Sequence, residues 1–251
     1  MPRNWKCTIE YDGSRYFGWQ RQPDQPTIQQ TIEEAATRIT GDGVVLTGSG
    51  RTDTGVHARG QVANFRTEAD RSREALLGGI NALIPDDIRI LDIEAVSEDF
   101  HARFDARSKR YVYRVYEGPT PPVFERHFCM HHRLPLDLER MRDAAERLLG
   151  RHDFRAFARK PPPHRNTVRS LTALDIWRRG ATMMFSLEAD GFLHTMVRSI
   201  VGTLLQVGNG KREPRDLETV LSSRDRTLSG PPAPPQGLFL MEVSYGTESV
   251  S

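Results

Sequence analysis

The chain has 251 residues and a mass of 28.5 kDa, enough for one large domain or two smaller ones with substantial cores. It contains no apolar run of bilayer length, no apolar segment of signal-peptide type at its start, and only two cysteines, which excludes membrane-spanning and disulfide-rich secreted proteins. We therefore expect a soluble cytoplasmic protein. Its formal net charge is +2.

The first half of the chain alternates predicted strands with predicted helices. A helix is expected behind Thr27, which fits a capping box with Gln30, and a second over residues 73–83, where Pro85 ends it. Strands are predicted at residues 7–11, 44–47, 61–66 and 88–95. A break near residues 98–108 follows, so we predict an N-terminal α/β domain over residues 1–105.

The second half repeats this mixture of elements. Asp137 can cap a helix that Gly150 ends, and an apolar helix is predicted over residues 193–207. Strands are predicted at residues 110–116, 171–177, 183–189 and 238–245. We therefore predict a C-terminal α/β domain over residues 106–246 and a polar tail over residues 247–251.

The positive charge is concentrated in two segments that also contain aromatic residues. Residues 103–114 carry five cations against one aspartate, and residues 151–169 carry six against one. Cations interleaved with aromatic faces suit a phosphate backbone and unstacked bases. This pattern favours a nucleic-acid partner over the alternative of a solvated arginine-rich surface.

Residues 48–65, GSGRTDTGVHARGQVANF, place the carboxylate of Asp53 among glycines and cations, ahead of a predicted strand. Glycines let such a loop turn sharply and let a ligand come close, while Arg51 and His57 could hold Asp53 in its charged form. This arrangement is typical of a catalytic carboxylate. On the residues of the loop alone, an ordinary Asp-Thr-Gly turn remains the alternative.

Arg198 is the one charged residue within the apolar helix predicted over residues 193–207. At about 100° per residue it falls at the edge of the apolar arc. A rim arginine can reach a carboxylate in a cleft, but it can equally extend into solvent along its apolar stem.

The loop GRTDTGVHARGQV closely resembles the signature of the TruA-type tRNA pseudouridine synthases. Further resemblances to this family run in family order along nearly the whole chain. They are YDGSRYFGWQRQP at 11–23, HARFDARSKRYVYRV at 101–115, HDFRAFA at 152–158, DGFLHTMVRSIVGTLLQVG at 190–208 and PPQGLFLMEVSY at 234–245.

The resemblance implies an isomerase that converts uridine to pseudouridine at positions 38, 39 and 40 of the tRNA anticodon stem-loop, and the family needs no cofactor. It makes Asp53 the catalytic aspartate, Tyr111 the aromatic that packs on the target uracil, and Arg198 the cation paired with Asp53. Arg51 would help to displace or hold the extruded nucleotide. The basic segments supply possible tRNA contacts, which are Arg107, Lys109, Arg110, Arg155, Arg159, Lys160, Arg165 and Arg169.

The resemblance also implies a fold class and an assembly. The family has two α/β domains of α+β type, each with a mainly antiparallel sheet and packed helices, with a basic cleft between them, and it acts as a homodimer that binds tRNA. Two departures stand in this chain: Thr54 replaces a common alanine, and His194-Thr195 replace a tyrosine followed by histidine or asparagine.

Three alternatives stay open on the sequence. Asp53-Thr54-Gly55 is also the triplet of aspartic proteases, although the expected apolar residues before the Asp and a second triplet are missing. A non-catalytic RNA-binding protein would keep the basic segments without the chemistry. A metal site could use His127, Cys129, His131 and His132, the first three on one face of a strand, but we find no partner cluster and expect no metal.

Overall fold

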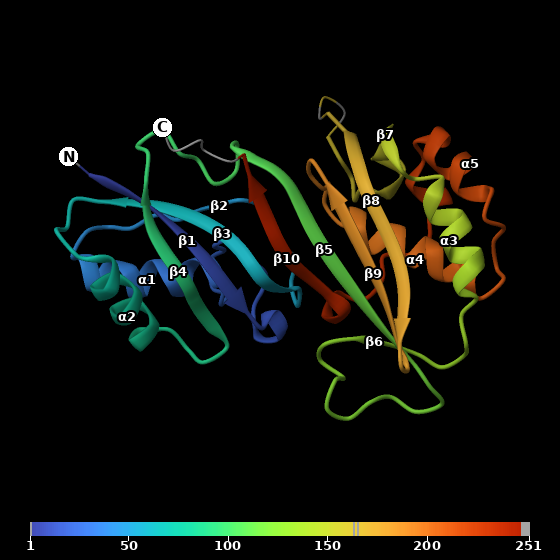
Figure 1. Cartoon of the computed structure of the whole chain (residues 1–251), viewed down its shortest axis with the longest axis horizontal. Helices are drawn as coiled ribbons and strands as arrows, with labels where there is room; N and C mark the ends of the chain where they lie inside the picture. Colours follow the sequence, from blue (N-terminus) through green and yellow to red (C-terminus); the bar gives the residue numbers. More distant parts are fainter. Residues whose placement is uncertain (1, 163, 165, 247–251) are drawn as a thin grey trace. The chain divides into compact units, whose positions relative to one another are not determined.

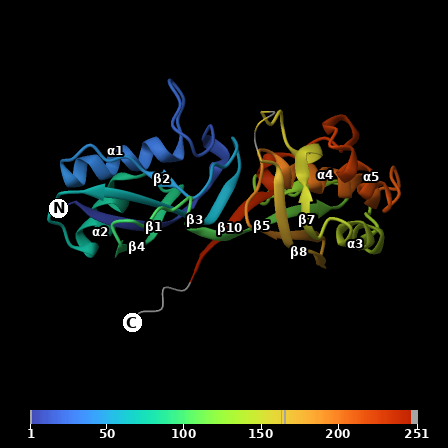
Figure 2. The same cartoon turned by 90° about the horizontal axis from the view of Figure 1, so that it is seen from above.

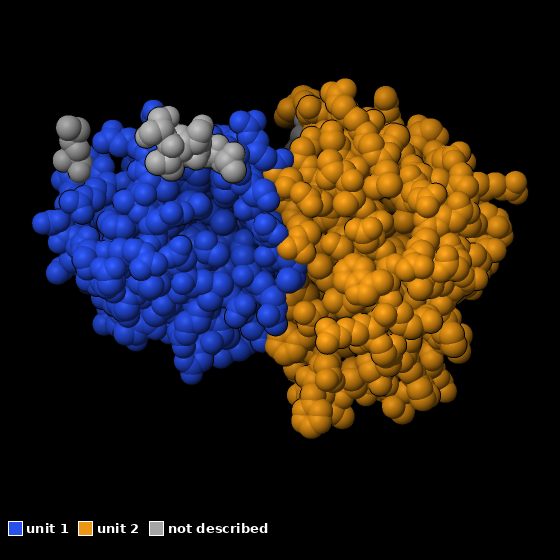
Figure 3. All heavy atoms as spheres, in the orientation of Figure 1, with its two compact units in different colours: residues 1–107, 240–251 blue, residues 108–239 orange. Residues whose placement is uncertain are grey.

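The computed structural model describes residues 2–162, 164 and 166–246. The chain divides into two compact units, which are coloured in Figure 3: unit 1 is residues 1–107 with 240–251, and unit 2 is residues 108–239. The sequence predicts two domains, residues 1–105 and residues 106–246, and this division stays a prediction. The tail predicted over 247–251 lies outside the described residues.

Unit 1 is built on an antiparallel sheet. Strand β1 lies between β3 and β4 in antiparallel register, with Cys7 opposite Ala63 on one side and Ile93 on the other. β10 follows β3 in the strand order. The strands are β1 (Arg3–Tyr11), β2 (Thr47–Gly48), β3 (His57–Thr67), β4 (Ile88–Val96) and β10 (Leu238–Tyr245).

Two helices pack against each other in unit 1, α1 (Ile28–Thr40) and α2 (Arg73–Leu83), and a short 3-10 turn, η1 (Gly13–Arg15), follows β1. Figure 2 shows α1 lying along one face of the strands. The helix buries Ile28 and Ile32 on that side, and Thr27 caps it by accepting the N–H of Gln30. The predicted capping box is half formed: the Gln30 side-chain amide donates to Glu34, and within the described residues Gln30 does not accept the N–H of Thr27.

Unit 2 contains the strands that end the order of the ten-stranded sheet, β5-β9-β8-β7 (Figure 1). Its neighbours pair antiparallel except for β6, which runs parallel to β5. The strands are β5 (Ala106–Glu117), β6 (Met130–His132), β7 (Gly150–Asp153), β8 (Val168–Arg179) and β9 (Thr182–Ala189). The helical segments are α3 (Leu138–Glu146), α4 (Met196–Gly208), α5 (Asp216–Ser223), η2 (Phe154–Phe157), η3 (Arg226–Leu228) and η4 (Pro235–Gly237).

Helix α4 is almost entirely buried and touches the segment after η3 backbone to backbone. A Cβ on Gly202 would lie 1.9 Å from the carbonyl oxygen of Pro231, so only glycine allows this approach. The N–H of Ala233 donates to the carbonyl of Arg198 at 2.9 Å. The first turn of α4 is therefore fixed against residues 230–233.

The predicted fold class, α/β of the α+β type with mainly antiparallel strands, is confirmed. The strand predicted at 44–47 is wrong for 44–46, because the backbone of Val44 and Leu46 bonds to side chains of α1 rather than to a neighbouring strand. The helix behind Asp137 ends at Glu146, and Gly150 starts β7 instead. The elements β7 and α5 were not predicted, and a strand near β6 was considered only for the metal alternative.

None of the helices in the described ranges has the length and apolarity needed to cross a bilayer.

Candidate active site

Asp53 lies in the loop that joins β2 to β3 in unit 1. Its side chain is half-buried, between the buried Thr52 and the exposed Thr54, and Arg51 is exposed. Gly55 adopts φ 75°, and the N–H of Val56 donates to the Asp53 carbonyl at 3.1 Å, which closes a tight turn. The sharp bend expected from the glycines is present, and Asp53 is half-buried within it.

Thr52, the residue before Asp53, is fixed by hydrogen bonds to its side chain and to its backbone. The Thr52 hydroxyl pairs with the Tyr11 hydroxyl at 2.8 Å, and the Thr52 carbonyl accepts the N–H of Trp19 at 3.1 Å. Burial raises the pKa of Tyr11 well above its usual range, so this phenol stays protonated and can hydrogen-bond at neutral pH. Residues from the first strand and from the segment after it therefore position the Asp53 backbone.

The start of the loop is tied to the strand that follows it. Ser49 donates to Gln61 at 2.7 Å, and the Gln61 amide donates to the Gly50 carbonyl at 3.0 Å. At the other end of the loop, His57 Nδ1 accepts the N–H of Gly13 at 3.1 Å, so the structure places this ring nitrogen against the η1 turn. Both ends of the loop are thereby fixed within unit 1.

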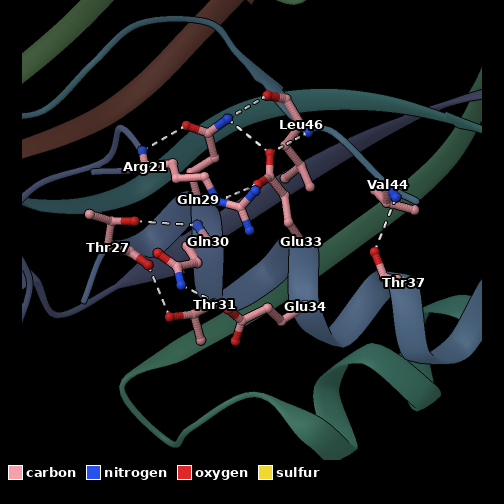
Figure 4. Close-up of polar contacts among 10 residues, drawn as sticks. All are labelled: Arg21, Thr27, Gln29, Gln30, Thr31, Glu33, Glu34, Thr37, Val44 and Leu46. Carbon is pink, nitrogen blue, oxygen red and sulfur yellow. Dashed lines mark hydrogen bonds and ion pairs between the residues drawn. The ribbon is translucent and has the colours of Figure 1, made fainter. Parts of the chain in front are cut away.

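A network of polar side chains on α1 holds the segment that leads into the loop (Figure 4). The buried carboxylate of Glu33 accepts the Leu46 N–H at 2.8 Å and the Gln29 amide at 2.9 Å. Gln29 also donates to the Leu46 carbonyl at 3.0 Å and accepts the N–H of Arg21 at 3.0 Å. The network satisfies backbone groups that have no strand partner, which a buried segment requires.

Unit 2 supplies the aromatic residue and the arginine predicted for the site. Tyr111 on β5 is 7% exposed, and its ring meets the Phe192 ring edge-on, with centroids 5.1 Å apart. Two residues along the strand, the Tyr113 hydroxyl donates to the Pro234 carbonyl at 2.7 Å. Burial raises the pKa of Tyr113, while the positive charge of Arg198 opposes that rise.

Arg198 projects from the first turn of α4 and is half-buried. Its Nε donates to the Ala233 carbonyl at 2.7 Å, in addition to the backbone bond between the same two residues. This pair of bonds fixes the guanidinium stem. Asp53 and Arg51 thus belong to unit 1, while Tyr111 and Arg198 belong to unit 2, and the pairing of Asp53 with Arg198 stays a prediction.

The structure groups some of the predicted tRNA contacts and separates others. Arg159 and Lys160 line a hollow of about 350 Å³ together with Arg198. Arg107, Lys109 and Arg110 lie along β5, Arg155 lies in η2, and Arg169 lies on β8, where it donates to the carbonyl of Val168. Arg165 lies outside the described residues.

Two of the histidines considered for a metal site contact backbone carbonyls through a ring nitrogen. His131 pairs with the Gly118 carbonyl at 2.7 Å and His132 with the Leu134 carbonyl at 2.6 Å. Within residues 2–162, 164 and 166–246, no three His, Cys, Asp or Glu side chains gather where they could hold a metal ion.

Sequence reasoning missed several residues that position this site. Gln29 and Glu33 were not singled out, although a polar pair four residues apart on the buried side of an amphipathic helix is a usable signal. Thr195 and Arg226, which line the same hollow as Arg198, were not assigned to it either. Only the fold brings Arg226 to the start of α4.

Comparisons with known proteins agree with the resemblance seen in the sequence. The family model described as tRNA pseudouridine synthase matches residues 8–105 and 144–246. The chain is 45% identical over 243 residues to tRNA pseudouridine synthase A 2 of Clostridium perfringens, covering 97% of this chain and all of that protein. It is 44% identical to tRNA pseudouridine synthase A of Acetivibrio thermocellus at the same coverage, and 44% identical to that of Bordetella avium over 95% of this chain and 90% of that protein.

Proposed function

The chain belongs to the tRNA pseudouridine synthase family, and from this premise we propose that its substrates are uridines 38, 39 and 40 in the anticodon stem-loop of tRNA. The observation that carries the proposal is the Asp53 loop, which hydrogen bonds hold at both ends and in which Asp53 is half-buried. A loop so constrained suits a group that must meet a reacting atom in a fixed orientation.

The reaction is an isomerisation that conserves all atoms. The N1–C1′ bond of uridine breaks, uracil turns, and C5 bonds to C1′, while the proton lost from C5 is replaced by one at N1. We assign Asp53, as the ionised carboxylate, to the group that acts on the uridine. The reaction uses no external group and no net oxidation, so the proposal includes no cofactor.

Three further residues are assigned to the substrate. Arg198 would pair with Asp53 and place a positive charge beside the reacting carboxylate. Tyr111 would pack on the target uracil, a role that suits an aromatic ring whose orientation is set by Phe192. Arg51, exposed beside Asp53, would hold or displace the extruded nucleotide.

The tRNA would also contact basic residues of both charged segments. The protein would act as a homodimer, so that one tRNA contacts two subunits. Because its substrate is a tRNA, we expect the enzyme to act in the cytoplasm. These assignments rest on the family resemblance and on the distribution of charge.

The test is pseudouridine formation in an unmodified tRNA transcript, mapped by carbodiimide-dependent primer extension. Wild type, Asp53→Asn and Asp24→Asn are compared with no cofactor added. Asp24 is an exposed residue of unit 1 with φ 57°, a conformation that asparagine tolerates, so it is a matched control. We expect product at the anticodon arm with wild type and Asp24→Asn only.

Two results would contradict the proposal. Equal activity in Asp53→Asn would remove the role assigned to that carboxylate. Normal tRNA binding by a folded wild-type protein, with no product on any tRNA, would support the non-catalytic RNA-binding alternative.

The role of Arg198 has its own test. Arg198→Ala should lower kcat far more than it weakens tRNA binding, because the pairing acts on the reacting carboxylate. Arg198→Lys should recover part of the lost rate, because it keeps the charge while losing the Nε bond to Ala233. Equal losses of binding and catalysis would count against the pairing.

A further inference from the structure

A hollow of about 350 Å³ opens in unit 2 at the start of α4. Four of its six lining residues are cations and none of the six is acidic. The lining consists of Arg159, Lys160, Thr195, Arg198, Arg226 and Pro232. Such a concentration of positive charge at the N-terminus of a long helix, where backbone N–H groups point outward, attracts an anion.

The backbone at the edge of the hollow is strained. Lys160 adopts φ 42° and Thr195 adopts φ 63°, so two of the four non-glycine residues with positive φ in the described part of the chain line this one hollow. The two segments are joined, because the N–H of Arg159 donates to the His194 carbonyl at 3.0 Å. Strained residues of this kind persist where the surrounding structure holds them, often at binding sites.

Thr195 has a hydroxyl without a described partner. It precedes α4 at the N-cap position, yet it makes no side-chain cap bond, unlike Thr27 ahead of α1. The residue is 8% exposed, and its Oγ1 is buried without a hydrogen-bond partner within the described residues. A buried hydroxyl left unpaired costs free energy, which a bound acceptor would recover.

Arg226 brings a partly desolvated positive charge to the same place. Its Nη1 donates to the Ser229 hydroxyl at 2.6 Å and to the Gly230 carbonyl at 3.1 Å, and neither acceptor neutralises its charge. Burial lowers the pKa of Arg226, as expected for a cation held among neutral groups. The exposed Arg159 and Lys160 form no ion pair with the residues that the structure describes.

We propose that this hollow binds one backbone phosphate of the RNA substrate, a phosphate that flanks the target uridine. The placement rests on the proposed function, because Arg198 both lines the hollow and is the residue assigned to Asp53. A flipped nucleotide needs its backbone held on at least one side, and a clamped phosphate supplies that hold. The exposed lip formed by Arg159 and Lys160 suits a chain of phosphates better than a free phosphate ion.

The first test compares two lysines that undergo the same change of charge. Lys160→Gln should weaken binding of an anticodon stem-loop RNA about three- to tenfold and lower the slope of log K against log salt by roughly 0.7–0.9. Lys211→Gln removes an exposed lysine of the same unit outside the hollow, so it should match wild type in filter binding. Thr195→Val, checked for folding by thermal unfolding, should weaken binding about tenfold through loss of the hydroxyl.

The second test locates the phosphate. Each phosphate flanking the target is replaced in turn by an uncharged methylphosphonate. One replacement should weaken binding to wild type about as much as Lys160→Gln does, and it should have no further effect on that variant. The proposal is overturned if neither replacement matters, or if Lys160→Gln and Lys211→Gln bind RNA equally well.

Inorganic phosphate serves as the competing ligand. Saturation of the hollow by micromolar phosphate, with RNA binding unaffected, would assign the site to a free anion and overturn the RNA assignment. Because all of these readouts are binding constants, they remain measurable if no pseudouridine is formed. Failure of the phosphate site and failure of the proposed reaction are therefore distinguishable.

Discussion

Removal of the buried Glu33 carboxylate should lower the stability of unit 1 strongly. The side chain is 3% exposed, and its Oε1 accepts both the Leu46 N–H and the Gln29 amide. Glu33→Ala would leave two buried donors without an acceptor, each costing about 1–3 kcal/mol, and would remove buried methylene surface as well. We expect a loss of about 3–5 kcal/mol in the free energy of unfolding.

Two variants separate the hydrogen bonds from the charge. Glu33→Gln keeps an acceptor oxygen and the volume, and it loses mainly the 3.5 Å pairing with the half-exposed Arg21, so the loss should stay below about 1 kcal/mol. Glu34→Ala alters the exposed neighbour on the same helix and should change stability by about 0.5 kcal/mol or less. Urea unfolding followed by tryptophan fluorescence measures all three.

The Glu33→Ala substitution should also affect catalysis, because Leu46 precedes β2 and the loop that contains Asp53. Because residues 44–46 run into the Asp53 loop, Glu33→Ala should also lower kcat by roughly ten- to a hundredfold at a temperature where the variant is still folded. A Glu33→Ala variant no less stable than Glu34→Ala would refute the view that this carboxylate anchors the segment.

Other predictions follow from single contacts. Gly202→Ala should cost at least about 1–3 kcal/mol, because the new Cβ would lie 1.9 Å from the carbonyl oxygen of Pro231, and thermal unfolding will show it as a lower Tm. Burial raises the pKa of Cys7 and Cys129, so both thiols should resist Ellman's reagent at pH 8 and react only after unfolding; rapid reaction of the native protein would contradict this. Hydrogen bonds from the Thr67 hydroxyl and from backbone N–H groups lower the pKa of Asp42 below its ordinary 3.8, so its stabilising effect is present above about pH 4 and is lost as pH falls through the lowered value. The difference in Tm between wild type and Asp42→Asn should therefore shrink between pH 6 and pH 3, and a constant difference would exclude this cause.

Local signals in the sequence were sufficient for the elements that carry their own boundaries. The helix over 73–83 matches α2, and the strand over 238–245 matches β10, because capping residues, a following proline and alternation mark their ends locally. The strand predicted at 44–47 is wrong for residues 44–46 for a tertiary reason. Its apolar residues fit a strand, but its backbone partners are side chains of a helix that comes earlier in the chain.

The same distinction applies to the candidate site. The Asp53 turn and the half-buried Arg198 were predictable from glycine placement and helical periodicity. The hollow was not, because Arg226 reaches α4 only through the backbone contacts around Gly202 and Pro231. Hydrophobic periodicity is a local signal, so it does not predict a contact between segments so far apart in sequence.

The segment at residues 11–23, the first that resembles the family, has a physical reason to accompany the Asp53 loop. A Cβ on Gly13 would lie 2.0 Å from the Val56 carbonyl oxygen, and one on Gly18, whose φ is +86°, would lie 2.6 Å from that of Thr52. The backbone N–H of Trp19 donates to the same Thr52 carbonyl. This segment is therefore the surface against which the loop is shaped, so substitutions at Gly13 or Gly18 should displace Asp53 without removing any group that acts on the uridine. We expect Gly18→Ala to lower kcat more than it weakens tRNA binding, and an unchanged kcat would show that the loop holds its position without that close approach.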